Sequence, residues 1–446
     1  MLNNNSLFSS IANYLSRIVI SELYMTVLML LCSISNSFSG YAQDSLAIND
    51  LDVHQTDIVE VIRKARGKEP KDKSNDASSL ILVPIIGSNP ATGFMIGVGG
   101  QYAFKMLEST RYSAFSGSVQ LTTKGQMLFL VKNNIFTKSD RIFLSGDWRL
   151  QLFSQSTYGL GTNSPEGGIL DYQFNLAGQE TNFDSLAQPM SFNLIRFHQT
   201  VSFKIRPSFY IGLGYNLDGY AKIVDEKLRL NQGDTLITSH YAYSQNYGFS
   251  TKEYYSSALA VNFIYDSRDN IINPYRGYYA MLSWRGAMEV LGSERTGNFY
   301  QVEWRSYHGL SKRNPRHLLG FWLMGNFAPK GEFPYLILPA TAYDQKGRSA
   351  RGYAQGRFRG TNYVYSEAEY RFPLGHYGGI WGGVVFVNAT STTNEAQSLA
   401  LFQSVKPGYG FGLRLMLDKH SRTNLAMDIG FGHQSSGFYL GVSEAF

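Results

Sequence analysis

Cysteine, long apolar stretches and clustered charge are almost absent from this sequence of 446 residues. The single Cys, Cys32, lies near the N-terminus, so the remainder of the chain has no thiol for a disulfide framework. Beyond the extreme N-terminus, no run approaches the roughly 18 apolar residues that a membrane-spanning helix needs, which excludes a helical membrane protein. The net charge of +6 comes from Lys and Arg residues scattered along the chain, which argues against nucleic acid as a partner.

Sequence signals for catalysis are also missing. There is no Gly-x-Ser-x-Gly nucleophile motif, and the eight His residues, such as His198, His308 and His420, show no metal-ligand spacing. We therefore expect no catalytic residues, no metal site and no cofactor. The sequence predicts that the protein is not an enzyme.

Aromatic residues and glycine are abundant, with 30 Tyr, 29 Phe and 44 Gly, and apolar residues recur with a period of two. In residues 408–417 the apolar side consists of Tyr409, Phe411, Leu413, Leu415 and Leu417. Residues 141–152 alternate in the same way, with Asp147 and Arg149 on the polar side. Strands with one apolar and one charged face are typical of a barrel in lipid around a wet interior. A soluble β-sandwich also alternates, but its strands usually run only about 5 or 6 residues, whereas these are long enough to cross a membrane.

The alternation predicts an all-β fold, a 16-stranded antiparallel transmembrane β-barrel. The expected strands are 80–88, 92–105, 110–122, 125–137, 140–153, 190–205, 207–220, 254–268, 275–290, 296–309, 316–329, 361–373, 379–389, 405–417, 422–432 and 435–446. Every long connection follows an odd-numbered strand, namely 154–189, 221–253, 330–360 and 390–404. This asymmetry is expected of outer-membrane barrels, which have short periplasmic turns and long extracellular loops.

The N-terminal residues predict export. Residues 25–38 are apolar, follow Arg17 and precede small residues that end at Ala42, so residues 1–42 are expected to be a cleaved signal peptide. The apolar run is too short to span a bilayer. A lipoprotein anchored at Cys32 and a buried N-terminal helix in a cytoplasmic protein are the alternatives.

The rest of the chain divides into two expected parts. Residues 43–78 are polar and predict a short periplasmic tether, with one short helix around residues 57–66. Residues 79–446 are expected to form the barrel. Export and a barrel together predict the bacterial outer membrane, with its lipids and lipopolysaccharide as surroundings.

The last expected strand carries an aromatic pattern. Phe438, Leu440, Val442 and Phe446 are expected to share one face, with Gly441 between them. The terminal aromatic resembles the recognition signal that barrel-assembly machinery reads on its clients. The alternative is a strand that merely ends in Phe.

Three segments resemble a known superfamily, that of outer-membrane assembly factors and bacterial surface antigens (BamA/TamA-type barrels). The first is Tyr265-Asp266-Ser267-Arg268-Asp269-Asn270, followed by Pro274 and Gly277, which is similar to the family's strand-turn-strand signature. The second is Arg351-Gly352-Tyr353, similar to the Arg-Gly-aromatic tip of a long loop. The third is the strand that contains Glu369. A polar periplasmic turn is the alternative for the first segment.

The resemblance implies that the long extracellular loop folds into the lumen, where Arg351 meets acidic groups. Glu369 matches the first acidic partner, while Asn388 stands where the family usually has Asp. Asn388 can still accept one hydrogen bond through its amide oxygen, but it brings no charge. Independently of the family, Glu367 and Glu369 lie on the polar face of their strand, where a guanidinium can bind a carboxylate in bidentate geometry. The family's periplasmic POTRA modules are not expected, because residues 43–78 are too few.

Three functions remain open. The first is assembly or insertion of outer-membrane proteins, or an accessory role in it, with unfolded outer-membrane proteins or barrel-assembly machinery as partners. A weak seam between the first and last strands would admit a client strand, because Pro84, Gly87, Pro90, Gly437 and Gly441 weaken strand pairing. The second function is a channel or transporter. The third is a structural surface-antigen barrel.

Overall fold

A computed structural model describes residues 55–68, 78–89, 93–123, 125–164, 187–230, 236–375 and 379–446, without the side chains of 86–89. The expected signal peptide and most of the expected tether lie outside these residues, so both stay predictions. Among the residues described, no helix has the length and apolar character needed to cross a membrane.

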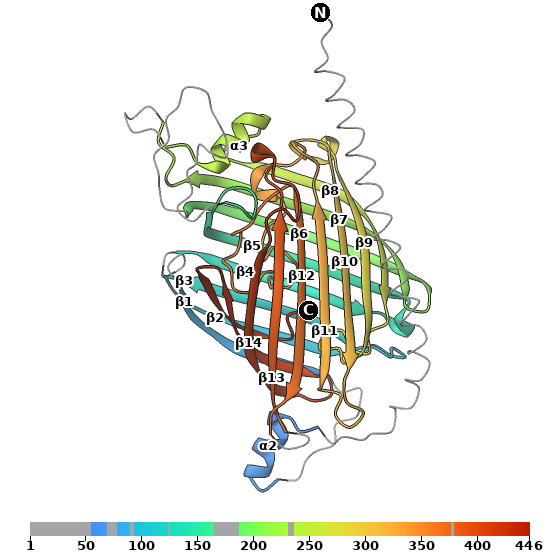
Figure 1. The fold of residues 1–446 in the computed structure, drawn as a ribbon. Coiled ribbons are helices and arrows are strands. Elements are labelled where there is room, and N and C mark those ends of the chain that lie inside the picture. The colour runs from blue at the N-terminus through green and yellow to red at the C-terminus, as the bar shows by residue number, and fades with distance from the viewer. Residues whose placement is uncertain are drawn as a thin grey trace, which may run out of the picture. The chain divides into compact units, whose positions relative to one another are not determined.

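Sixteen strands form one antiparallel sheet in which each strand pairs with its neighbours in sequence order, and the sheet curves into a nearly closed barrel (Figure 1). The strands are β1 (Ser79–Asn89), β2 (Gly93–Phe104), β3 (Ser113–Thr122), β4 (Met127–Phe136), β5 (Ile142–Thr157), β6 (Gln188–Arg206), β7 (Phe209–Asp225), β8 (Tyr254–Asp266), β9 (Gly277–Ala287), β10 (Gly297–Gly309), β11 (Leu318–Phe327), β12 (Asn362–Pro373), β13 (Trp381–Thr392), β14 (Lys406–Asp418), β15 (Thr423–Gly432) and β16 (Ser435–Val442). The predicted number and order are confirmed. The largest differences are at the ends of β5 and β7, which are longer than expected, and of β16, which is shorter.

Short helices accompany the sheet in the described residues. They are α2 (Ile58–Ala65), α3 (Ser239–Tyr247) and the 3-10 helices Lys138–Asp140, Glu289–Leu291, Tyr335–Ile337 and Glu395–Gln397. Helix α2 confirms the short helix expected around residues 57–66. Its N-terminus is capped by Asp57, whose Oδ1 accepts the backbone N–H of Glu60 at 2.9 Å. Lys419, in the turn after β14, forms an ion pair with Glu60 and so attaches the helix to the barrel.

The two faces of the sheet differ as the alternation predicted. On β14, Phe411 is 53% exposed and faces outward, while Arg414 on the opposite face is only 3% exposed. Asp428 on β15 is buried on that same inner face. In a soluble sandwich the apolar faces would be the buried ones. The outward apolar face therefore fits lipid, and the inner face carries the charges.

The sheet remains open between its first and last strands. Strand β1 pairs with β2 and β16 pairs with β15, and no β1–β16 ladder exists among the described residues. On the inner side, Gln101 Nε2 of β2 donates to Thr423 Oγ1 of β15 at 2.9 Å across this gap. We call the gap between β1 and β16 the seam.

The end of β16 corrects one prediction. The strand stops at Val442, Ser443 has a φ of +100°, and the following residues turn inward. Phe438 is 66% exposed whereas Phe446 is fully buried, so the expectation that they share one face is wrong. The physical reason is an ion pair inside the barrel that draws the chain end inward. The Glu444 carboxylate accepts a hydrogen bond from Arg414 Nε at 2.7 Å. The Phe446 ring then stacks on Trp322, with ring centroids 5.5 Å apart.

Replacing Phe446 with Ala is expected to destabilise the folded barrel. The variant loses the ring contacts with Trp322 and Tyr307 and leaves a cavity, which for a buried Phe costs about 3–5 kcal/mol of unfolding free energy. The measurement is the temperature at which refolded barrel loses its folded band in a heat-shift gel. Phe438→Ala is the matched control, because its ring is exposed and leaves no internal cavity. Equal shifts for both variants would contradict the buried position of Phe446.

Candidate functional site

The candidate site is the long connection between β11 and β12. Its two legs are joined by backbone hydrogen bonds, from Ala328 N to Thr361 O at 2.7 Å and from Thr341 N to Phe358 O at 2.9 Å. Residues 342–357 form the tip between these legs. The connection is therefore an ordered element that presents Arg351 at its tip.

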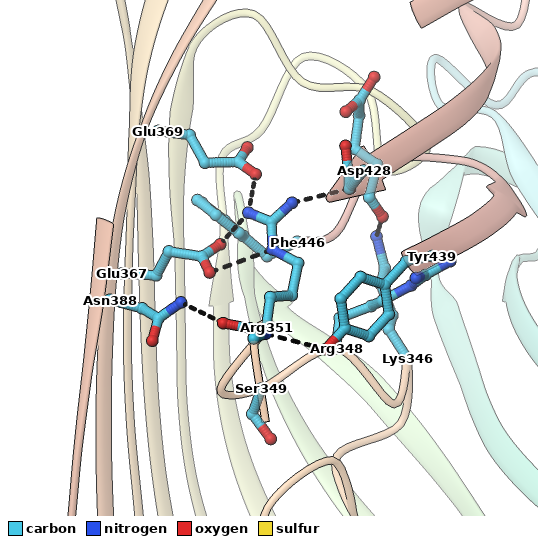
Figure 2. Close-up of polar contacts among 12 residues, drawn as sticks. Lys346, Arg348, Ser349, Arg351, Glu367, Glu369, Asn388, Asp428, Tyr439 and Phe446 are labelled. Carbon is cyan, nitrogen blue, oxygen red and sulfur yellow. Dashed lines mark hydrogen bonds and ion pairs between the residues drawn. The ribbon is translucent and has the colours of Figure 1, made fainter. Parts of the chain in front are cut away.

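Arg351 is fully buried and contacts three carboxylates (Figure 2). It binds Glu367 of β12 with two hydrogen bonds, Nη2 to Oε1 at 2.6 Å and Nε to Oε2 at 3.2 Å. Its Nη1 donates to Asp428 Oδ2 of β15 at 2.8 Å, and its Nη2 also contacts Glu369. The guanidinium lies 3.6 Å from the ring centroid of Phe386. These contacts all involve the inner face of the sheet, and we call them the loop clamp.

The structure brings Arg351 and Glu369 together, as the sequence implied, and adds two carboxylates. Glu367 was placed on the correct face by the alternation, and it supplies the bidentate contact. The sequence does not single out Asp428, because nothing in its local sequence links it to Arg351. One feature of the sequence could have pointed to Asp428: it is a single acidic residue on the inner face of a strand whose other inner residues are small.

Asn388 lies in the site in a different role from the one expected. Its Nδ2 donates to the backbone carbonyl of Arg351 at 3.0 Å. Its amide oxygen, which can accept a hydrogen bond, has no hydrogen-bond partner within the described part of the chain. The reason is that the guanidinium is already surrounded by carboxylates, whereas the Arg351 carbonyl needs a donor. An Asp carboxylate could not supply one.

Gly352 and Tyr353 fix the tip against β14, β15 and β16. Gly352 has a φ of +108°, and a Cβ there would lie 2.7 Å from the backbone of Phe431, so a side chain would not fit. Its N–H donates to the Tyr439 hydroxyl of β16 at 2.9 Å. The Tyr353 hydroxyl donates to Pro407 O at 2.6 Å. The three residues of the motif therefore contact five strands, β12 to β16.

The loop clamp belongs to a larger buried charge network. Asp428 also accepts from Arg414 Nη1 at 2.5 Å, and Glu369 accepts from Arg371 Nε at 2.8 Å. Arg414 in turn binds Glu444. Together the network contains the carboxylates of Glu367, Glu369, Asp428 and Glu444 and the guanidinium groups of Arg351, Arg371 and Arg414. Buried charges are stable only when each one is paired, so these side chains depend on one another.

The strand-turn motif forms a separate cluster between β8 and β9. Arg268 binds Asp266 with Nε to Oδ1 at 3.0 Å and Nη2 to Oδ2 at 2.8 Å. Asp269 accepts the backbone N–H of Tyr275 at 3.0 Å, across a turn that also contains Pro274. Gly277 has a φ of +102°, and a Cβ there would lie 2.4 Å from Ser267 O.

This cluster is attached to the turn after β14 rather than to the loop clamp. Arg422 Nη1 donates to Asp269 Oδ2 at 2.6 Å, and Asn270 Nδ2 donates to Ser421 O at 3.2 Å. The residues of the expected C-terminal signal face different sides of the sheet. Gly441 lies beside Arg348, whose Nη2 would be 2.7 Å from a Cβ there, whereas Phe438 faces outward.

Arg351→Ala is expected to weaken the barrel, because it leaves the Glu367, Glu369 and Asp428 carboxylates without their shared cation. Removing one partner of a buried ion pair typically costs about 3–5 kcal/mol, and water in the interior reduces this figure. Glu369→Gln is expected to act in the same direction. Heat-shift gels measure both, with Arg313→Ala at an exposed position as the control. Unchanged curves for both variants would disprove the loop clamp.

Asn388→Asp is expected to destabilise the barrel although it restores the residue usual in the family. It removes the donor to the Arg351 carbonyl and places a carboxylate opposite Glu367, its register partner on β12. An unmet buried acceptor costs about 1–3 kcal/mol. Thermal unfolding of the variant beside Asn388→Ala separates the added charge from the lost donor. A melting temperature above that of the unmodified barrel would show that the network lacks negative charge.

Comparison with known proteins places these features in a family. A family model described as the Omp85 superfamily domain matches residues 147–446. No curated protein matches the chain at a significant level. Similar solved structures include BamA from Haemophilus ducreyi lacking POTRA domains 1–3, with 12% identity and a TM-score of 0.49 over 84% of this chain and 71% of that one. Another is CdiB from Acinetobacter baumannii, with 12% identity and a TM-score of 0.47 over 82% of this chain and 60% of its own.

The family match covers β6 to β16 completely and includes both the loop clamp and the strand-turn motif. It confirms the resemblance to assembly-factor barrels and implies the outer membrane as the location. Since the matched region is well over half of the sequence, the chain belongs to the Omp85 superfamily of outer-membrane β-barrels.

Proposed function

We propose that this barrel assists the assembly or insertion of other outer-membrane proteins, alone or as an accessory to barrel-assembly machinery. Membership of the Omp85 superfamily supports a general role in outer-membrane assembly or secretion. The observation that carries the finer proposal is the seam, where β1 and β16 each have one edge that pairs with no other strand of the described residues. An unpaired strand edge is a template for adding an extended segment of another chain.

The composition of the edge strands favours an open seam. Pro84, in the middle of β1, has no N–H to donate to a neighbouring strand. Gly437 and Gly441 of β16 have no side chains to pack against a partner strand. A client segment would therefore compete with only weak pairing between the barrel's own ends.

In this proposal the loop lies in the lumen and holds the β16 side of the seam. Support comes from the contacts of Arg351 with β12 and β15 and from the Gly352 hydrogen bond to Tyr439 of β16. Because the loop clamp also binds β12, it ties β15 and β16 to a strand further along the same sheet. The β1 side has no such attachment in the described residues.

A channel is the second candidate, favoured by a cavity of about 1220 Å³ that is lined by the loop, by β16 and by strands β1 to β5. Uncharged polar side chains line much of it, among them Ser116, Ser118, Gln120 and Gln155. Deleting residues 335–358 would then raise single-channel conductance in planar bilayers. A structural surface-antigen barrel would show neither conductance nor an effect on other barrel proteins.

The decisive measurement is the folding rate of a second, unrelated barrel protein into liposomes that already contain this one. We expect acceleration by the purified barrel and a smaller acceleration by Arg351→Ala, because the loop clamp fixes one side of the seam. Liposomes with an equal amount of a barrel whose ends are paired serve as the control. If neither protein accelerates folding beyond that control, the assembly function is refuted and the channel becomes the better proposal.

A further inference from the structure

The free edge of β16 carries backbone carbonyls that face away from β15. Ser443 N–H donates to Asn424 O next to β15 at 2.9 Å, and hydrogen-bonding directions alternate along an antiparallel strand. The backbone of Leu440 therefore points to the opposite edge, toward the seam. Its carbonyl accepts from Arg348 Nη2 at 3.2 Å, and Glu444 O accepts from Lys346 Nζ at 3.1 Å. Figure 2 shows both basic residues beside Tyr439 of β16.

Arg348 and Lys346 are cations whose partners are neutral. Within the described residues, neither forms an ion pair with a carboxylate. Asp428 and Glu444 are already bound by Arg351 and Arg414, and the Asp344 carboxylate accepts the backbone N–H groups of Lys346 and Arg348 rather than their charged ends. The two charged ends at the edge of β16 therefore bind backbone carbonyls and no carboxylate of the described residues.

A third cation faces the same space. Lys132 of β4 lines the cavity together with Lys346 and Arg348, and its register partner on β5 is Asp147, whose carboxylate is bound by Arg149 and Arg196. The acids in that lining are Glu444, which is paired, and Glu226, beyond the end of β7. The cavity beside the seam is thus positive as well as polar.

The chain's own first strand does not match this charge. Residues 79–89 contain neither Asp nor Glu, and Val83 and Ile85 of β1 line the cavity with apolar side chains. Pairing β1 with β16 would require Arg348 to leave the Leu440 carbonyl without gaining another acceptor. This mismatch gives a physical reason for the open seam.

We propose that the β16 edge selects an extended polypeptide segment that carries a carboxylate on its lumen-facing side. The inference rests on the proposed function, because it names the class of segment that the seam accepts. In antiparallel pairing, the segment residue opposite Leu440 shares its outward face, so the residues on either side of it point inward toward Arg348.

The exchange conserves hydrogen bonds and gains an ion pair. A backbone N–H of the segment replaces Arg348 at the Leu440 carbonyl, and the carboxylate of the segment replaces that carbonyl at the guanidinium. The carboxylate adds the Coulomb attraction of an opposite charge, which the neutral Leu440 carbonyl does not offer to the guanidinium. An acidic segment that pairs with β16 therefore gains binding free energy from the new ion pair. A neutral segment replaces one hydrogen bond with another and gains no ion pair.

The test uses two short fluorescent peptides in which Val and Ser alternate, one with a single Glu on the Ser side and the other with Gln at that position. Binding to the purified full-length barrel in detergent is followed by fluorescence anisotropy. We expect the Glu peptide to bind about tenfold more tightly, because its carboxylate carries a charge opposite to that of Arg348 whereas the Gln amide is neutral. Raising the salt concentration should reduce this preference, since the ion pair is partly exposed.

Arg348→Gln and Lys346→Gln keep a hydrogen-bond donor and remove the charge, so each should lower binding of the Glu peptide toward that of the Gln peptide. Lys312→Gln, at an exposed position between β10 and β11, is the matched control and should retain the preference. A heat-shift gel verifies that each variant keeps the loop clamp. Equal binding of both peptides by the unmodified barrel would overturn this inference and leave edge pairing intact. Binding of neither peptide would overturn the proposed function as well.

Discussion

The contact on which the rest of this barrel depends is the buried guanidinium of Arg351 among three carboxylates. A charge removed from water is stable only with full pairing, and here the pairs come from the loop, from β12 and from β15. None of the three elements can move alone without leaving a buried charge unpaired. The loop and the strands β12 and β15 are therefore expected to move together.

This coupling makes the two sides of the seam unequal. Strand β16 is bound to the loop through the Tyr439 hydroxyl and through the carbonyl of Leu440. No hydrogen bond joins the described part of β1 to the loop, and β1 is held by its ladder with β2. Any opening of the barrel should then displace β1 and β2, while β16 keeps its place beside the loop.

The sequence predicted the strands well because a strand in lipid must repeat its apolar face locally, as Tyr409, Phe411 and Leu413 do. The position of Phe446 was predicted wrongly because periodicity assumes that the strand continues. The Glu444–Arg414 ion pair and the stacking on Trp322 turn the chain inward, and both partners are distant in sequence. Asp428 escaped prediction for the same reason, since 77 positions separate it from Arg351.

Asn388 shows how the charges in the clamp limit one another. Taken alone, an amide where the family has an acid is a lost partner for Arg351. In the structure, Glu367, Glu369 and Asp428 already surround the guanidinium, and the buried network has one more carboxylate than guanidinium groups. A further acid at position 388 would add repulsion without a cation to meet it. The amide instead donates the hydrogen bond that the Arg351 carbonyl requires. Asn388 therefore supports the loop clamp through the backbone of Arg351 rather than through its guanidinium.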